Sequence, residues 1–224
     1  MMSKIILNFL EELALNNHKA WFEDNRSSYE SAKNELIHVL AQVIAQLGEV
    51  DKTIAGTDPA KCIFRQYRDL RFSKNKTPYK TTMSGYIAWG GKNSDKAGYY
   101  LHLEPQNSFI GGGLWVPQPP ILKAVRSEIY FNGEEFKQII EKPEFFKLFG
   151  SLQGEKLINT PKDFPADSPV SELLKHKSYI VSGPLSLEKI DSLQLARFAT
   201  RTFTTLTPFV QFLNRAIQNK EDYR

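Results

Sequence analysis

Hydrophobic residues near the N-terminus follow a helical spacing. Apolar positions recur at intervals of three and four over residues 3–15, which predicts a helix. A second stripe of the same period runs from Asn17, a candidate N-cap, to Gly48 and predicts a long amphipathic helix. Residues 1–50 are therefore expected to be helical, and residues 51–60 to form a loop.

The period of the pattern changes from 3.6 to 2 between Cys62 and Phe72, which predicts a strand. The alternating set that begins at Cys62 is expected to be half-buried, and the other set polar. Three further strands are expected over residues 81–89, 99–104 and 107–115. The connections between these strands are too short for parallel crossovers, so residues 61–116 are predicted to form an antiparallel β-meander.

After Pro117 the helical period returns. Short helices are expected over residues 121–129, 133–140, 144–149 and 171–175, and a long last helix over 193–219 with a kink near Pro208. The order of helices, then strands, then helices predicts an α+β fold in which helices cover one face of a small antiparallel sheet. We expect a single domain over residues 1–224, with residues 117–224 as its helical C-terminal part.

Composition limits the class of protein. The chain has 224 residues, of which 41% are hydrophobic, so a folded core is expected and disorder is not. Cys62 is the only cysteine, which excludes an intrachain disulfide and favours a reducing, cytoplasmic location. A small core residue is the usual role of such a cysteine, and a nucleophile is the alternative. Glu11 and Glu12 interrupt the apolar N-terminal stretch, so a signal peptide or membrane span fits poorly.

The charge is concentrated in one segment. The chain carries a net charge of +4, yet residues 61–80 hold seven basic residues and one acid, which is +6 for that segment and −2 for all other residues. Aromatic residues are interleaved with the basic ones. This pattern is typical of a site that holds an anion.

Within this segment the spacing limits which cations can act together. Arg65 and Arg71 would lie about 20 Å apart on a strand, too far to hold one small phosphate. A turn after Phe72 could instead bring lysines back toward the end of the strand, where Asp69 would orient an arginine. A mixture of guanidinium and ammonium groups suits phosphate or carboxylate. The candidate anion-binding residues are Arg65, Arg68, Arg71, Lys74, Lys76, Tyr79 and Lys80. The alternative is that these are solvated charges on an exposed sheet face.

The run YYLHLEP at residues 99–105 supplies candidate catalytic groups. On a strand, Tyr100, His102 and Glu104 would point to the face opposite the apolar residues between them, with His102 and Glu104 about 7 Å apart at Cα. A histidine beside a carboxylate is suited to general acid or base catalysis, and neighbouring arginines could stabilise negative charge. An ordinary half-exposed strand can carry the same residues.

Other residues could line a pocket around these groups. The glycine run that contains Gly112, followed by Trp115, would let backbone approach a ligand and form an anion nest, although a bulge explains it equally well. Trp21 and Arg26 on the second helix could roof the pocket, although core packing is the simpler interpretation.

No metal site or cofactor is predicted. The four histidines lie far apart in the sequence, and no HxH, HExxH or acidic loop groups them, although His102 with Glu104 could be half of a metal site. No GxSxG motif is present, which removes the commonest serine hydrolase signature.

Five runs of the chain, taken together, resemble the bacterial domain of unknown function 2461 family. They are NNHKAWFEDNRSSYE, FRQYRDLRFSKNKTPYKT, GYYLHLEPQNSFIGGGLW, and FPADSP with LLKHKSYIVSGPL. The resemblance implies an intracellular α+β protein without a settled activity. Gln66 stands where an apolar residue is common, and Asn75 where an aspartate is common, which removes one acid. The residues that match are Arg65, Arg68, Asp69, Arg71, Phe72, Lys74, Lys76, Pro78, Tyr79, Lys80, His102, Glu104 and Trp115.

Three functions remain open at this point. The first is a binding or catalytic pocket for a phosphorylated or other anionic small molecule, in which His102 would be the acid or base. The second is a nucleic-acid-binding module that uses the same lysines with stacking aromatic residues. The third is a non-catalytic scaffold whose charges only solvate the sheet. No membrane partner is expected, and the sequence identifies neither a cofactor nor an oligomeric state.

Overall fold

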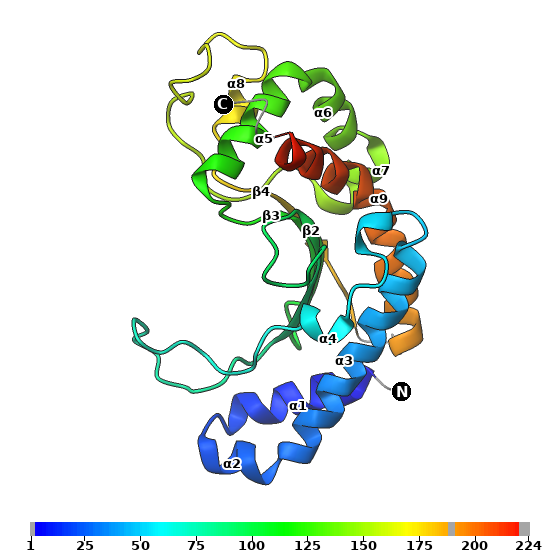
Figure 1. Ribbon diagram of the computed structural model, residues 1–224. Helices are drawn as coiled ribbons and strands as arrows, with labels where there is room; N and C mark the ends of the chain where they lie inside the picture. Colours follow the sequence, from blue (N-terminus) through cyan, green and yellow to red (C-terminus); the bar gives the residue numbers. More distant parts are fainter. Residues whose placement is uncertain (1–2, 188–190, 220–224) are drawn as a thin grey trace. The chain divides into compact units, whose positions relative to one another are not determined.

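The computed structural model describes residues 3–187 and 191–219, in which helices precede and follow a four-stranded sheet (Figure 1). The strand order is β1-β2-β3-β4, and neighbouring strands are antiparallel. The strands are β1 (Met83–Ile87), β2 (Gly98–Leu103), β3 (Phe109–Leu114) and β4 (Tyr179–Pro184). The predicted α+β class is confirmed; β1 and β3 lie inside their predicted ranges, and β2 begins one residue before its own.

Two compact units divide the chain. The first unit comprises Met1–Asn93, Tyr100–Ile110 and Pro184–Thr202. The second comprises Ser94–Tyr99, Gly111–Gly183 and Phe203–Arg224. The expectation of a single domain stays a prediction.

The helices of the first unit come mostly before the sheet. They are α1 (Ser3–Leu15), α2 (Lys19–Asp24), α3 (Arg26–Leu47), the 3-10 turn η1 (Lys52–Ile54) and α4 (Pro59–Cys62). The prediction of one long helix from Asn17 is wrong. His18 caps α2 by accepting a hydrogen bond from the Trp21 amide. The helix is interrupted at Asn25, whose side chain donates to the Trp21 carbonyl. An asparagine that competes for backbone groups in this way favours a helix end.

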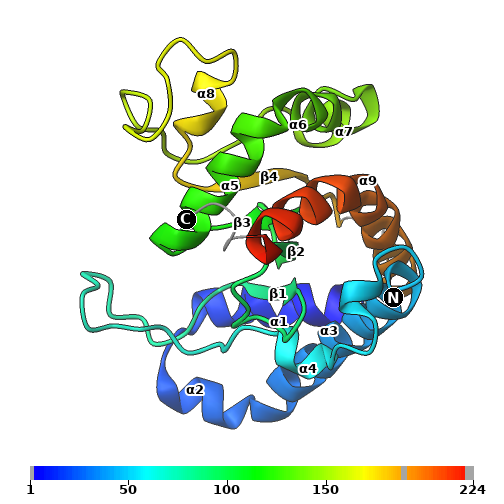
Figure 2. The ribbon, with the colours of Figure 1, turned by 45° about the horizontal axis from the view of Figure 1, so that its top comes forward.

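The core of the first unit lies between the helices and β1. Helices α1 and α3 pack together, and α3 packs on β1 (Figure 2). Leu10, Leu36 and Val43 are fully buried there. A Cβ atom at Gly85 would lie 2.7 Å from Leu40 Cδ1, so the absence of a side chain on β1 lets α3 approach closely.

The prediction of a strand over residues 62–72 is wrong at both ends. Cys62 closes α4, and the extended residues that follow pair at isolated bridges, Ile63 with Gly85 of β1 and Tyr67 with Tyr79 before β1. The predicted alternation of burial holds as far as Leu70, after which Phe72 is 96% exposed. Residues 63–85 therefore form a partial hairpin with a long loop.

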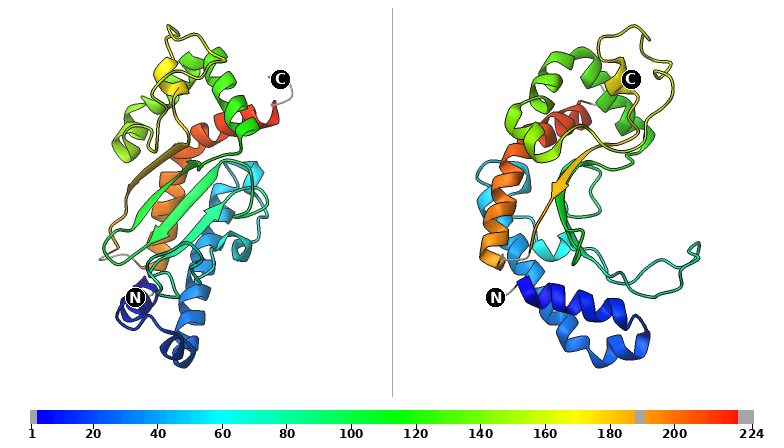
Figure 3. Two further views of the ribbon diagram at one scale, coloured as in Figure 1. Left: turned by 90° about the vertical axis from the view of Figure 1, so that its left-hand side faces the viewer. Right: turned by 180° about the vertical axis from the view of Figure 1, so that it is seen from behind.

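Four helices of the second unit lie between β3 and the C-terminus, beside β4. They are α5 (Pro119–Phe131), α6 (Gly133–Ile140), α7 (Pro143–Phe149) and α8 (Ser171–Leu174), and each matches a predicted helix. Strand β4, at the edge of the sheet in Figure 3, was not predicted. Helix α9 (Ser192–Gln218) continues through Pro208. Phe136 of α6 packs against Phe209 and Phe212 of α9, with ring centroids 5.9 and 4.9 Å apart.

Candidate functional site

The basic segment forms a loop that projects away from α1, α2 and α3, which belong to the same unit (Figure 1). Arg68 holds this loop closed. Its guanidinium donates to the Thr77 carbonyl at 3.2 Å and to Ser73 Oγ at 3.1 Å, and it also bonds to the Thr77 hydroxyl. Arg68 is therefore used in the structure of the loop.

The cations at the end of the loop interact with the loop itself. Arg71 forms a bidentate pair with Asp69, at 3.0 Å from Nε to Oδ1 and 2.6 Å from Nη2 to Oδ2. This pair holds the pKa of the Asp69 carboxyl below its usual range. Lys76 donates to the Leu70 carbonyl at 3.2 Å, and Lys74 is exposed. Asp69, Arg71 and Lys76 thus make their contacts inside the loop.

Tyr79, a predicted anion ligand, lies in the core of the first unit. It is 2% exposed, and its ring stacks on Phe22 of α2 with centroids 3.9 Å apart. The Asn17 side chain accepts from the Tyr79 amide and donates to the Tyr79 carbonyl, both at 3.1 Å. Asn17 is therefore an anchor for the returning arm of the hairpin, and Tyr79 packs the loop base against the helices.

Trp21 and Arg26, the predicted roof of the pocket, make their contacts among the N-terminal helices. The Trp21 ring stacks on Phe9 with centroids 6.3 Å apart. Arg26 pairs with Glu30 at 3.3 Å and lies over the Tyr29 ring. Packing among the helices therefore explains Trp21, whereas Arg26 is an exposed residue paired with Glu30 on the surface.

The predicted grouping on β2 is present. Tyr100 Oη and His102 Nδ1 are 3.1 Å apart, and His102 Nε2 lies 3.7 Å from Glu104 Oε2. The His102 ring stacks on Phe109 of β3, with centroids 4.5 Å apart and an angle of 17°. The strand alternation thus places a histidine between a phenol and a carboxylate.

Burial sets the protonation of this group. Burial lowers the pKa of His102, and the positive charge of Lys80 lowers it further, while Glu104 acts in the opposite direction. The imidazole is therefore neutral at pH 7. A neutral ring has one N–H, and the carboxylate of Glu104 can only accept it. Nε2 therefore carries the proton, and Nδ1 accepts from Tyr100. Burial also raises the pKa of Tyr100, against a hydrogen bond from Ser84.

Lys80 connects the basic segment to β2. Its Nζ lies 5.7 Å from the centroid of the Phe64 ring, and Phe64 packs edge-on against Tyr100 at 6.1 Å. Burial lowers the pKa of Lys80, and the charge of Arg65 acts in the same direction. Among the residues that the structure describes, the Lys80 ammonium forms no ion pair. Arg65, Lys80, Tyr100, His102 and Glu104 are called the sheet-face cluster below.

Gly112 and Trp115 belong to the second unit. A Cβ atom at Gly112 would collide with the Gly98 carbonyl oxygen and lie 2.8 Å from Leu206 Cδ2 of α9. Close packing of β3 against its neighbours therefore explains this glycine. Trp115 is 72% exposed just after β3.

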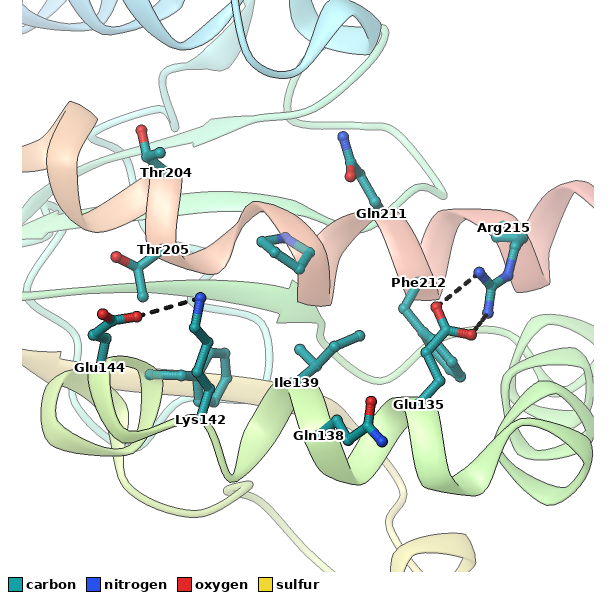
Figure 4. A pocket seen from close by; sticks show the side chains of 12 residues that line it. Glu135, Gln138, Ile139, Lys142, Glu144, Thr204, Thr205, Gln211, Phe212 and Arg215 are labelled. Carbon is teal, nitrogen blue, oxygen red and sulfur yellow. Dashed lines mark hydrogen bonds and ion pairs between the residues drawn. The ribbon is translucent and has the colours of Figure 1, made fainter.

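A concavity lies in the second unit, between α6, α7 and α9 (Figure 4). It has a volume of about 640 Å³. Glu135 and Arg215 are paired at one side of it at 2.6 Å, and Lys142 and Glu144 at the other at 3.3 Å, with Ile139 between them. Because these charges neutralise one another, this groove does not favour an anion. None of the residues predicted from the sequence line it, since it depends on how helices distant in sequence pack.

The thiol of Cys62 is buried. Its Sγ lies 3.6 Å from the Asp58 carbonyl oxygen, and burial raises its pKa to about 11. A protonated thiol is a poor nucleophile at neutral pH. The prediction that Cys62 is a small core residue is confirmed.

None of the helices that the structure describes is both long and apolar enough to cross a membrane. Over residues 3–187 and 191–219, no three His, Cys, Asp or Glu side chains gather into a group that could hold a metal ion.

The family described as "Conserved hypothetical protein (DUF2461)" matches residues 5–212. The chain belongs to this family. The resemblance seen in the sequence motifs is thereby confirmed, and the matched range contains both the loop and the sheet-face cluster. No curated protein and no solved structure matches the chain. The description of the DUF2461 family names no activity, so the function has to be argued from the sheet-face cluster.

Proposed function

We propose that this DUF2461 protein binds a phosphorylated or other anionic small molecule at the sheet-face cluster. The observation that supports this most strongly is Lys80. Its ammonium is partly buried, has Arg65 as a cationic neighbour, and forms no ion pair among the described residues. A charge removed from water without a counter-ion is unfavourable, and a bound anion would relieve that cost.

The two cations suit phosphate or carboxylate. Arg65 offers a planar fork that can bind two oxygens, and Lys80 offers a point charge. The rings of Phe64 and Phe109 border the cluster and contact Tyr100 and His102. Their apolar surface lowers the local dielectric constant and strengthens the attraction between the cations and an anion.

His102 gives the site a possible reaction. Nε2 carries the ring proton toward Glu104, so the lone pair that can accept a proton is on Nδ1, to which the Tyr100 hydroxyl bonds. A ligand proton would pass to the Tyr100 oxygen as the Tyr100 proton moves to Nδ1, and Glu104 would stabilise the imidazolium that forms. We propose general acid or base catalysis by His102 as the enzymatic form of this function.

A calorimetric titration with pyrophosphate and with inorganic phosphate tests the binding. Lys80→Gln should weaken binding by about 10-fold or more, because a charge-assisted hydrogen bond contributes about 1.5 to 3 kcal/mol. Lys74→Gln is the matched control, since Lys74 is an exposed lysine of the same segment and lies outside the cluster. Equal affinities of the wild-type protein and Lys80→Gln would refute the anion site.

The catalytic form needs a separate test. Phosphatase, esterase and nuclease substrates should be compared with wild-type protein and His102→Ala. Turnover that persists in His102→Ala would remove His102 from the reaction, and it would leave the binding proposal to be judged by the Lys80 titration alone.

A further inference from the structure

Phe72 has no place in the proposed small-molecule site, yet it is the most exposed large hydrophobic residue among the described residues. Its relative exposure is 96%, at the end of the loop that projects from the first unit. The right-hand view of Figure 3 shows the same projection from behind. An aromatic side chain held this far from any core gives no stability to the fold, so it is available to a partner.

Hydrogen bonds inside the loop hold it in one conformation. Ser73 Oγ receives a bond from Arg68 and donates to the Asn75 carbonyl at 2.8 Å. Asn75 Oδ1 accepts from the Thr77 amide at 2.9 Å. Ring presentation on such a preformed loop reduces the conformational entropy that binding would cost.

Basic residues flank the ring in the sequence. Lys74 and Lys76 follow Phe72 in the sequence, and the Arg71 guanidinium carbon lies 5.9 Å from the centroid of the Phe72 ring. Asp69 is the only acid of this segment and is paired with Arg71. One exposed aromatic ring among cations matches a ligand that has both a flat apolar surface and repeated negative charge.

We propose that the loop tip, residues 71–76, binds single-stranded nucleic acid. Phe72 stacks on an unpaired base, and Lys74 and Lys76 contact neighbouring phosphates. Stacking platforms among cations are the common device of proteins that bind single strands without sequence preference. This function uses residues outside the sheet-face cluster and does not depend on the small-molecule site.

The loop fits a single strand better than its two main alternatives. A duplex keeps its bases paired and stacked, so it offers no free base face to Phe72. In an anionic bilayer, insertion of Phe72 would carry the polar side chains and backbone of Ser73, Lys74 and Asn75 toward the hydrocarbon. Stacking needs only the face of the ring.

Fluorescence anisotropy with a labelled oligothymidylate of about 12 nucleotides tests the proposal at low salt. Phe72→Ala should weaken binding between about 5-fold and about 150-fold, which is the range for loss of one stacked base. Phe72→Leu should lose as much, because leucine has no aromatic face, whereas Phe72→Trp should bind at least as well. Ile158→Ala removes a 92% exposed side chain from the second unit and should bind like the wild type.

Salt dependence and the second site complete the design. With two to three phosphates neutralised, log affinity should fall with log salt at a slope between about −1.4 and about −2.1, and Lys74→Gln should make this slope shallower by about 0.7. Lys80→Gln should leave oligonucleotide binding intact, which separates the two sites. Wild-type protein that ignores the oligonucleotide, or Phe72→Ala that binds it normally, would overturn the proposal. Binding to phosphatidylserine vesicles that Phe72→Leu retains, without binding to the oligonucleotide, would overturn it in favour of a membrane.

Discussion

Lys80 is the residue that most favours an anion site, because its surroundings oppose its positive charge. Burial and the neighbouring Arg65 both lower its pKa, while the Phe64 ring gives only a weak attraction to the ammonium. The same lysine lowers the pKa of His102. An anion bound beside Lys80 would thus change the protonation of His102, and the two residues should respond to a ligand together.

A different histidine should affect stability in acid. His176 is 2% exposed, and burial followed by the charge of Lys156 lowers its pKa to about 4. Arg126 adds to this effect, while Glu172 and the Gln153 backbone oppose it. The unfolded chain, with a pKa near about 6.5, binds a proton that the folded protein refuses, so stability falls as the pH drops from about 6.5 to about 4.

The loss attributable to His176 is at most about 3 kcal/mol over that range. Urea unfolding of wild-type protein and His176→Gln at several pH values measures it. The variant should lose less stability than the wild type between neutral pH and pH 4.5. Parallel pH profiles for the two proteins would show that His176 does not titrate as its burial implies.

At single residues, the sequence predicts which side a residue faces better than it predicts a partner. The alternation of β2 is enough to group Tyr100, His102 and Glu104. It does not reveal that Arg68 donates hydrogen bonds to Thr77, because that contact depends on how the loop closes. Tyr79 was misassigned for a related reason, since its burial depends on Phe22, which lies far away in the sequence.

Among the elements, the partial hairpin of residues 63–85 decides the geometry of the site. Its arms meet at isolated bridges, and Arg65 and Lys80 lie in the two arms between these bridges. The period-2 pattern predicts these extended arms. It cannot mark the end of pairing, because Arg68, Ser73 and Asn75 bond to loop backbone and side chains in place of a strand partner.

Strand β4 was missed because its signal is short. Its Gly183 faces the Leu148 carbonyl too closely for any side chain, so packing has replaced the usual β-branched pattern there. Its neighbour β3 lies more than 60 residues earlier in the chain, and no local pattern reports that pairing. The helices that follow β3, whose periods are local, were predicted with ends close to those observed, whereas the interruption at Asn25 and helix α4 were missed.

The contact between α5 and α9 should be sensitive to one arginine. Arg215 Nε donates to Glu128 Oε1 at 2.8 Å, and the Glu128 side chain is only 2% exposed. Arg215→Met would leave this carboxylate buried without its cation. The expected loss is about 2 to 3 kcal/mol, below the usual 3 to 5 for a fully buried pair because the Arg215 side chain is 40% exposed.

Glu135→Gln provides the contrast on the same arginine. Glu135 pairs with Arg215 at 2.6 Å but is 48% exposed, so its removal should cost less than about 1 kcal/mol. Urea denaturation compares both variants with the wild type. Equal losses in Arg215→Met and Glu135→Gln would mean that the burial of Glu128 has no energetic consequence.

For the whole molecule, the basic segment contributes cations to two separate places in the first unit. Residues 61–80 hold a charge of +6 on a chain whose other residues sum to −2. The structure divides this charge between the sheet-face cluster and the loop tip, which carry different neighbours. The two proposals accordingly predict opposite responses to Lys80→Gln and Phe72→Ala, and one feature can fail without the other.

The most direct test of the anion site is the titration of His102, followed by NMR of its imidazole with and without pyrophosphate. In the free protein the pKa of His102 should lie below its usual value, because of burial and Lys80. Saturation with pyrophosphate should raise this pKa, since a nearby anion stabilises imidazolium, and Lys80→Gln should abolish the rise. A His102 titration that pyrophosphate leaves unchanged in the wild-type protein would contradict an anion site at the sheet-face cluster.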